Sequence, residues 1–427
     1  MSRQAYRGAV FHFLDDPAAG GTRFFDDGVL IVEDGRVVEA SAWDEDVYRR
    51  LKGAPVVRFS HGLIVPGFID CHVHYPQIDI VASPAGALLD WLSHAVFPAE
   101  ARFRHEEVAA ETARFFLDEM MRNGVTSALV FATVHKVSVE ALFAEALKRN
   151  LRLIAGKVLM DANAPPDILD TAETGYMESR GLIRDWQGKG RLGYAVTPRF
   201  ALTSTPEGLE AAGRLVAEYP DVLLHTHLSE NADEIKAVRR AFPDCADYLA
   251  VYEKFGLVTE RSVFAHCVHL SPEEWTRFKA SGAAAAFCPD SNLFLGSGLF
   301  DVEAAAGARI GLASDVGAGT GLSPFAAMAA AYRVCRLKKR PMDAFRLFYL
   351  AGLGAARALR IDGRVGNFAA GKEADFVVLD AGRLPLLARR LSFAQTVEEK
   401  LFAFAMLGDD RAVARTYVAG DLAYERV

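Results

Sequence analysis

Residues 62–74 of the chain read Gly62-Leu63-Ile64-Val65-Pro66-Gly67-Phe68-Ile69-Asp70-Cys71-His72-Val73-His74, an apolar run that ends in two histidines. The apolar part predicts a buried strand, and in a strand residues two apart point to the same face. His72 and His74 can therefore present two imidazoles side by side to one metal ion. A His-x-His pair by itself is equally typical of two hydrogen-bonded histidines at a strand end.

Three further apolar runs end in residues that can bind a metal. Their closing residues are His225 with His227, His266, and Asp315. Four strand-like segments that end in nitrogen or carboxylate ligands are rarely produced by chance, so together they favour a metal site.

Eight apolar runs are predicted to be strands. They span residues 63–74, 124–131, 151–159, 193–196, 222–227, 262–266, 283–288 and 310–314. Helical periodicity occupies segments between them, among others residues 106–122, 138–149, 207–218, 233–241 and 272–280. Strict alternation implies parallel strands with crossover helices, and eight units predict a closed (β/α)₈ barrel of the TIM type over residues 66–365. The candidate ligands then end the first, fifth, sixth and eighth strands, on the face where such barrels carry their chemistry.

Two regions do not fit the barrel. Residues 1–65 read as short β segments with turns, in which Asp34-Gly35 is a strong hairpin signal. Residues 366–427 read the same way. Because neither region is long enough for a core of its own, we expect both termini to form one small β-sandwich domain.

Composition excludes several classes of protein. Of 427 residues, 51% are apolar and 24% charged, which is ordinary for a compact globular chain. The formal charge of −7 gives no basic excess, so nucleic acid is not an expected partner. Five scattered cysteines without a Cys-x-x-Cys spacing indicate reduced thiols and exclude a zinc ribbon. With no signal core and no bilayer-spanning run, we expect a cytoplasmic protein without a membrane partner.

A catalytic zinc site needs a few nitrogen and oxygen ligands and an open position for water. His72, His74, His227 and Asp315 supply four protein ligands. His225 is a rival to His227, since both face the same way on one strand. We prefer His227 because it is nearer the strand end, with Glu230 three residues on, and expect His225 to be a buried core histidine.

On the basis of these residues and the motifs around them, the chain resembles the amidohydrolase superfamily. Within it, the chain resembles the mononuclear-zinc branch that contains the guanine deaminases. The superfamily resemblance rests on residues 66–74, His227 with Glu230, Ala265-His266, and Asp315. The finer resemblance rests on His74-Tyr75-Pro76-Gln77, Leu89-Asp90-Trp91-Leu92, Phe97-Pro98-Ala99-Glu100, Thr197-Pro198-Arg199-Phe200, His227-Leu228-Ser229-Glu230-Asn231 and Asp315-Val316-Gly317-Ala318-Gly319-Thr320. It extends through Gly371-Lys372-Glu373-Ala374-Asp375 and so covers nearly the whole chain.

The resemblance implies one zinc ion per chain, with iron as a possible substitute, held by His72, His74, His227 and Asp315. It implies that Asp315 also takes a proton from the attacking water. Glu230 would donate a proton to N3 of guanine, and xanthine and ammonia would be the products. A homodimer is expected on the same analogy.

The resemblance also implies how the substrate is held. Arg199 and Gln77 would bind the O6 and N7 edge, Phe200 would pack on the purine ring, and His266 would orient the water. The residues expected to contact substrate are His74, Gln77, Arg199, Phe200, His227, Glu230 and Asp315. Without Pro198 and Phe200 beside it, we would interpret Arg199 as an ordinary surface residue in a salt bridge.

Some residues and functions stay open on the sequence. Asp290 stands where many relatives would carry a neutral residue, and it either perturbs the site or faces solvent. Lys157 could bridge two metals in a cyclic-amide hydrolase, although we interpret it as structural, and His269 is expected to have no chemical role. Other rivals are a deaminase of another purine, pyrimidine or aminotriazine ring and a non-catalytic scaffold. Nucleobase deaminases with a Pro-Cys-x-x-Cys motif are excluded.

Overall fold

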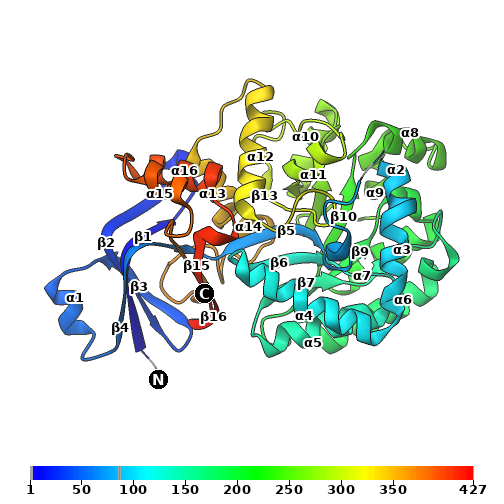
Figure 1. The fold of residues 1–427 in the computed structure, drawn as a ribbon. Coiled ribbons are helices and arrows are strands. Elements are labelled where there is room, and N and C mark those ends of the chain that lie inside the picture. The colour runs from blue at the N-terminus through cyan, green and yellow to red at the C-terminus, as the bar shows by residue number, and fades with distance from the viewer. Residues whose placement is uncertain (1–2, 85, 87, 427) are drawn as a thin grey trace.

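The structure is a computed structural model that describes residues 3–84, 86 and 88–426. It consists of a barrel of parallel strands, with helices around it, and of a separate, smaller sheet. Strands from the N-terminal and C-terminal parts of the chain form this smaller sheet (Figure 1). Among the described residues, no helix is both long and apolar enough to cross a membrane.

The predicted barrel is confirmed. Its strands, each parallel to its neighbour, are β5 (Phe68–His74), β6 (Val125–Phe131), β7 (Arg152–Gly156), β9 (Gly193–Pro198), β10 (Leu223–Leu228), β11 (Ser262–His266), β12 (Ala284–Phe287) and β13 (Arg309–Leu312). The barrel closes just beyond β13, where Asp315 N donates to His72 O at 2.9 Å and His74 N donates to Val316 O at 2.6 Å. The last strand is thereby tied to the first at the level of the histidine pair.

Two predicted strands are each divided in the structure. The run at residues 63–74 is split at Gly67 into β4 (Val56–Pro66) of the small sheet and β5 of the barrel. Any side chain at Gly67 would collide with that of Thr126, so this crossing point requires glycine. The run at residues 151–159 is interrupted at Lys157 and continues as β8 (Val158–Leu159), which pairs with β9.

The five predicted helices are confirmed to within a few residues at their ends. They are α4 (Glu106–Arg122), α5 (Lys136–Lys148), α7 (Pro206–Glu218), α8 (Ala232–Ala241) and α10 (Pro272–Ser281). The other barrel helices are α6 (Ala172–Trp186), α9 (Tyr248–Lys254), α11 (Pro289–Phe294), α12 (Pro324–Leu337), α13 (Ala344–Leu350) and α14 (Leu353–Ala358). Capping boxes begin α8 at Asn231 and α10 at Ser271, which gives both helices defined starts.

The connection after β5 is the longest structured one in the barrel. It contains η2 (Tyr75–Ile80), α2 (Leu88–Trp91), the π-helical turn η3 (Leu92–Val96), α3 (Phe97–Ala101) and η4 (Arg102–Arg104). Its apolar side chains form a core cluster with residues that follow β6 and β9. This connection therefore lies over the carboxyl ends of the strands.

A small β domain from both termini is also confirmed, but its form differs from the expected sandwich. One mixed sheet runs β16 (Asp421–Glu425), β15 (Val413–Val418), β14 (Phe376–Leu379), β4, β1 (Arg3–Phe13), β2 (Thr22–Glu33) and β3 (Arg36–Ala42). Because β4 pairs with β1 on one side and β14 on the other, the strands of the two termini join edge to edge instead of facing one another. The Asp34-Gly35 turn joins β2 to β3 with positive φ at both residues, as the sequence predicted.

The C-terminal region also contains helices that were predicted to be β structure. They are α15 (Pro385–Leu391) and α16 (Val397–Leu407). Helix α16 packs on α12 and α13 and buries Leu401 and Phe404. Its apolar residues therefore extend the barrel core and contribute no strand to the sheet.

Candidate active site

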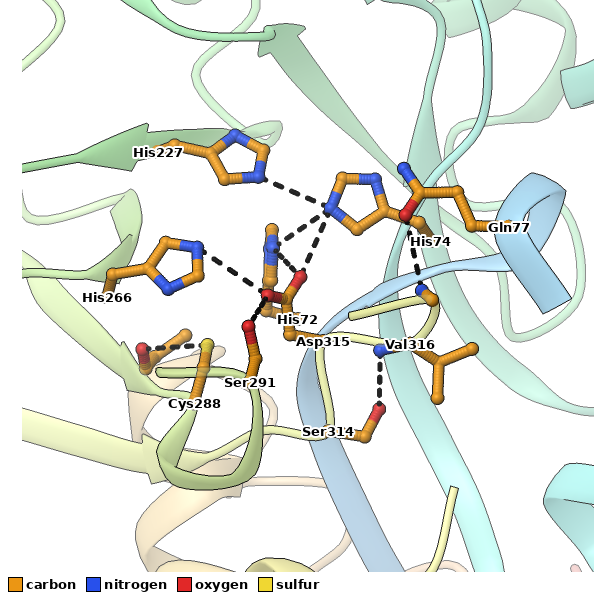
Figure 2. A network of polar contacts seen from close by, with 12 residues as sticks. His72, His74, Gln77, His227, His266, Cys288, Ser291, Ser314, Asp315 and Val316 are labelled. Carbon is orange, nitrogen blue, oxygen red and sulfur yellow. Dashed lines mark hydrogen bonds and ion pairs between the residues drawn. The ribbon is translucent and has the colours of Figure 1, made fainter. Parts of the chain in front are cut away.

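The site lies at the carboxyl ends of the barrel strands, as predicted (Figure 2). His72 and His74 end β5, His227 lies near the end of β10, His266 ends β11, and Asp315 follows β13. Parallel strands in a closed barrel bring their ends to one rim, so residues remote in sequence meet there.

Histidine nitrogens and one carboxylate converge at the centre of this rim. Nε2 of His74 lies 3.1 Å from Nε2 of His72 and 3.3 Å from Nε2 of His227. Oδ1 of Asp315 lies 2.9 Å from Nε2 of His72 and 3.3 Å from Nε2 of His74. His266 joins the group, since ligand atoms of His72, His227, His266 and Asp315 all lie within 4.8 Å of one another. All four predicted metal ligands therefore lie together.

These separations suit a zinc ion. In a tetrahedral site with bonds of ~2.0–2.1 Å, ligand atoms lie ~3.3 Å apart, close to the distances among these groups. Burial lowers the pKa of His74 to about 3 and that of His227 well below its usual value, which keeps both rings neutral as metal binding requires. Burial raises the pKa of Asp315, but nearby His72 and His266 outweigh it and hold that pKa well below its usual range. The donor set therefore includes the neutral imidazoles of His74 and His227 and the carboxylate of Asp315.

His225 does not join the cluster but supports it. The residue is fully buried, and its Nε2 lies 2.7 Å from Nδ1 of His72. If Nδ1 of His72 carries the proton and donates to His225, Nε2 of His72 keeps its lone pair for a metal. The preference for His227 over His225 as the ligand agrees with this geometry.

Glu230 and His266 lie beside the cluster, with Nε2 of His266 3.5 Å from Oε2 of Glu230 and 3.7 Å from Oδ2 of Asp315. Ser297 donates a hydrogen bond of 2.8 Å to Oε1 of Glu230. Burial, reinforced by the charge of Asp315, raises the pKa of Glu230 to about 8. A carboxyl group with such a pKa can hold a proton near neutral pH and pass it on.

A pocket beside this cluster is lined by both polar and apolar groups. The polar lining includes His74, Gln77, Arg199, His227, Glu230, His266 and Asp315. The apolar lining consists of Leu88, Trp91, Leu92, Phe200, Leu295 and Ala318. All predicted substrate contacts therefore line one pocket, and its walls suit a flat ring with a polar edge.

The residues left open by the sequence lie outside this pocket. Oδ2 of Asp290 accepts hydrogen bonds of 2.8 Å from N and Oγ1 of Thr320, so this carboxylate anchors a loop. Lys157 is buried, forms ion pairs with Asp170 and Glu178, and does not line the pocket. Nε2 of His269 lies 2.7 Å from Ser297 O and supports the loop that carries Ser297.

Several supporting residues were not predicted from the sequence. Ser291 donates a hydrogen bond of 2.6 Å to Oδ2 of Asp315 (Figure 2). Oδ1 of Asn292 lies 2.9 Å from Nδ1 of His266. Glu100 pairs with Arg199 and Gln77. Glu100 belongs to one of the motifs that carried the resemblance, but the motif indicated no partner for it.

Comparisons with known proteins give the family of the chain. Residues 63–423 match the amidohydrolase family. The guanine deaminase of Escherichia coli (strain K12) is 46% identical over 430 residues, which are 99% of this chain and 98% of that protein. The chain therefore belongs to the amidohydrolase family and, within it, to the group of the guanine deaminases.

Solved structures give the same result. The structure of E. coli guanine deaminase superposes with a TM-score of 0.96 at 44% identity and covers 100% of both chains. The guanine deaminase of C. acetobutylicum, solved with guanine in its active site, superposes with a TM-score of 0.91 at 29% identity and covers 99% of this chain and 100% of that one.

Proposed function

We propose that this protein hydrolyses guanine to xanthine and ammonia, as part of purine catabolism or salvage. The observation that carries the proposal is one pocket that joins a histidine and aspartate cluster, a protonatable Glu230, and the donors of Arg199 and Gln77. The full-length similarity to guanine deaminases supports the same substrate.

His72, His74, His227 and Asp315 would hold one zinc ion, and iron is a possible substitute. When bound, the metal acts as a Lewis acid that makes hydroxide available near neutral pH. The nearly tetrahedral separations of the four groups support this assignment.

The chain's own residues handle the protons. Water adds to C2 of guanine, and Asp315, whose low pKa keeps it ionised, takes the proton that the water loses. Glu230 donates its proton to N3, so that the ring nitrogen accepts the electron pair displaced by the attack. His266, within 3.7 Å of Asp315, orients the attacking oxygen. The new hydroxyl at C2 then gives its proton to Glu230, which passes it to the amino group. The C2–N bond breaks, ammonia leaves, and the carbonyl of xanthine forms.

Recognition follows from the kind of hydrogen-bonding group each side chain offers. A guanidinium can only donate hydrogen bonds, and O6 of guanine can only accept them. Adenine carries an amino group at that position and would leave the buried Arg199 facing another donor. Phe200, which is 5% exposed and lines the pocket, offers the ring a packing surface.

A substrate panel read by ammonia release tests this proposal. It should include guanine, adenine, adenosine, cytosine and an aminotriazine, each with zinc-loaded protein. We expect guanine to be turned over orders of magnitude faster than the others, because an unmatched buried polar group can cost about 10⁴-fold in specificity. A faster rate on another ring would assign the protein to a different deaminase of the family.

We further propose a cytoplasmic homodimer whose chain divides into a small domain of residues 1–65 and 366–427 and a barrel of residues 66–365. The cytoplasmic location is supported by five cysteines that form no disulfide. The division is supported by Gly67, where the chain passes from the small sheet into the barrel. The dimer rests on analogy with barrels of this kind.

A further inference from the structure

Glu100 is a buried carboxylate that the reaction described above does not use. The residue lies on α3, is 1% exposed, and lines no part of the substrate pocket. It nevertheless contacts both residues assigned to the O6 and N7 edge. Nη1 of Arg199 donates to its two oxygens at 2.9 and 2.7 Å, and Nε2 of Gln77 donates to Oε1 at 2.9 Å.

These contacts fix the orientation of both donors. Both hydrogen bonds from Arg199 to Glu100 come from Nη1, which leaves the donors on Nε and Nη2 outside this pair. The Gln77 amide is held at both ends, since its Oε1 accepts a hydrogen bond of 3.2 Å from Gly317 N (Figure 2). The amide therefore cannot flip, and its second N–H hydrogen remains available.

The same contacts decide the charge of the pocket wall. Arg199 is 2% exposed. Among the described residues, Glu100 is the one carboxylate that forms an ion pair with it. A buried guanidinium without a counter-charge would attract an anionic ligand strongly. Paired with Glu100, Arg199 offers hydrogen-bond donors with little net charge.

We propose that Glu100 is a positioning residue that aligns Arg199 and Gln77 and cancels the charge of Arg199, so that the site takes a neutral oxopurine and releases an anionic one. This inference rests on the proposed function. Guanine is neutral near physiological pH, whereas xanthine is the more acidic purine and forms an anion at mildly alkaline pH. Charge cancellation therefore weakens product inhibition without weakening the bond to O6.

The test compares inhibition by xanthine with inhibition by hypoxanthine, a neutral 6-oxopurine, at mildly alkaline pH. For Glu100→Gln we expect the ratio of xanthine affinity to hypoxanthine affinity to rise about tenfold or more above the wild-type ratio. The reason is that one buried positive charge becomes uncompensated. We expect guanine kcat/KM to fall about 10- to 100-fold, mainly through KM. Zinc content should match wild type, since Glu100 touches no metal ligand.

Glu100→Asp separates alignment from charge. It keeps the carboxylate and shortens the side chain, so KM for guanine should rise while the xanthine-to-hypoxanthine ratio stays at the wild-type value. If the ratio is unchanged in Glu100→Gln, or shifts equally in Glu100→Asp, the charge role is wrong. If KM for guanine is unchanged in both variants, the alignment role is wrong.

A double variant, Glu100→Gln with Arg199→Gln, removes both charges and should lose the preference for xanthine that the single Glu100→Gln variant gains. Equilibrium binding of both purines can be measured calorimetrically without turnover. Failure of wild type to deaminate guanine would overturn the proposed function, whereas an unchanged binding ratio in the variants would overturn only the role of Glu100.

Discussion

Asp315 and His72 are joined twice, once through the backbone and once through their side chains. Asp315 N donates to His72 O at 2.9 Å, and Oδ1 of Asp315 lies 2.9 Å from Nε2 of His72. The first contact closes the barrel and the second belongs to the proposed metal cluster. The same two residues therefore close the barrel and belong to the proposed metal cluster, and they come from its first and last strands.

Replacing a proposed ligand should remove metal without unfolding the chain. We expect His72→Ala and His74→Ala to lower zinc content and abolish guanine turnover, because three of four donors cannot form the same site. Elemental analysis and far-UV circular dichroism measure the two quantities, and His105→Ala, at an exposed position, is the matched control. Full zinc occupancy in both site variants would refute the assignment.

His225 should matter for metal affinity although it binds no metal. We expect His225→Leu to weaken zinc binding about 10- to 100-fold, since the hydrogen bond that orients His72 is lost. His225→Gln can still offer an oxygen to Nδ1 of His72 and should lose less. Competition with a chromophoric chelator gives both affinities, and wild-type affinity in the leucine variant would show that the contact plays no part.

Glu230→Gln should separate chemistry from binding. Glutamine is nearly isosteric and Glu230 is not a proposed ligand, so zinc, fold and much of the guanine affinity should remain. Turnover should fall about 10²- to 10⁴-fold or more, the usual worth of a positioned acid or base. Glu207→Gln, at an exposed position, serves as the control. A near-normal rate together with a lower melting temperature would indicate a structural role for Glu230.

His12 gives the small domain a pH-dependent stability. Burial lowers the pKa of this histidine to about 4, so folding favours its neutral form. The stabilisation is complete above the unfolded pKa of about 6.5 and is lost as the pH falls toward about 4, which amounts to about 2 kcal/mol between pH ~7 and ~5. His12→Gln should remove this part of the acid sensitivity, measured by denaturant unfolding. His61→Gln, at an exposed position of the same sheet, should not.

Most of the fold could be predicted from the sequence, because the periodicity of strands and helices and the turn residues between them are local features. The strand at residues 262–266 and the helix at residues 106–122 match their observed bounds, since each has an unbroken pattern and a clear end. The break at Gly67 was missed because the run is apolar on both sides of it, and only the approach of Thr126 requires the break. Helix α16 was missed because its apolar residues pack on α12 and α13, which are distant in sequence.

The proposed site residues all lie together because each lies at or just beyond the carboxyl end of a barrel strand, and the strand ends of one barrel share one rim. The supporting contacts could not be predicted in this way. Ser291, Ser297 and Glu100 act through partners on other loops, and a sequence pattern does not tell which loops meet.

Zinc titration of the metal-free protein, with xanthine formation followed by ultraviolet absorbance, tests the central claim most directly. We predict no guanine turnover without metal and a rate that rises with added zinc to saturate at one zinc ion per chain. Guanine turnover by the metal-free protein, or a rate that needs two ions per chain, would contradict a mononuclear metal-dependent guanine deaminase.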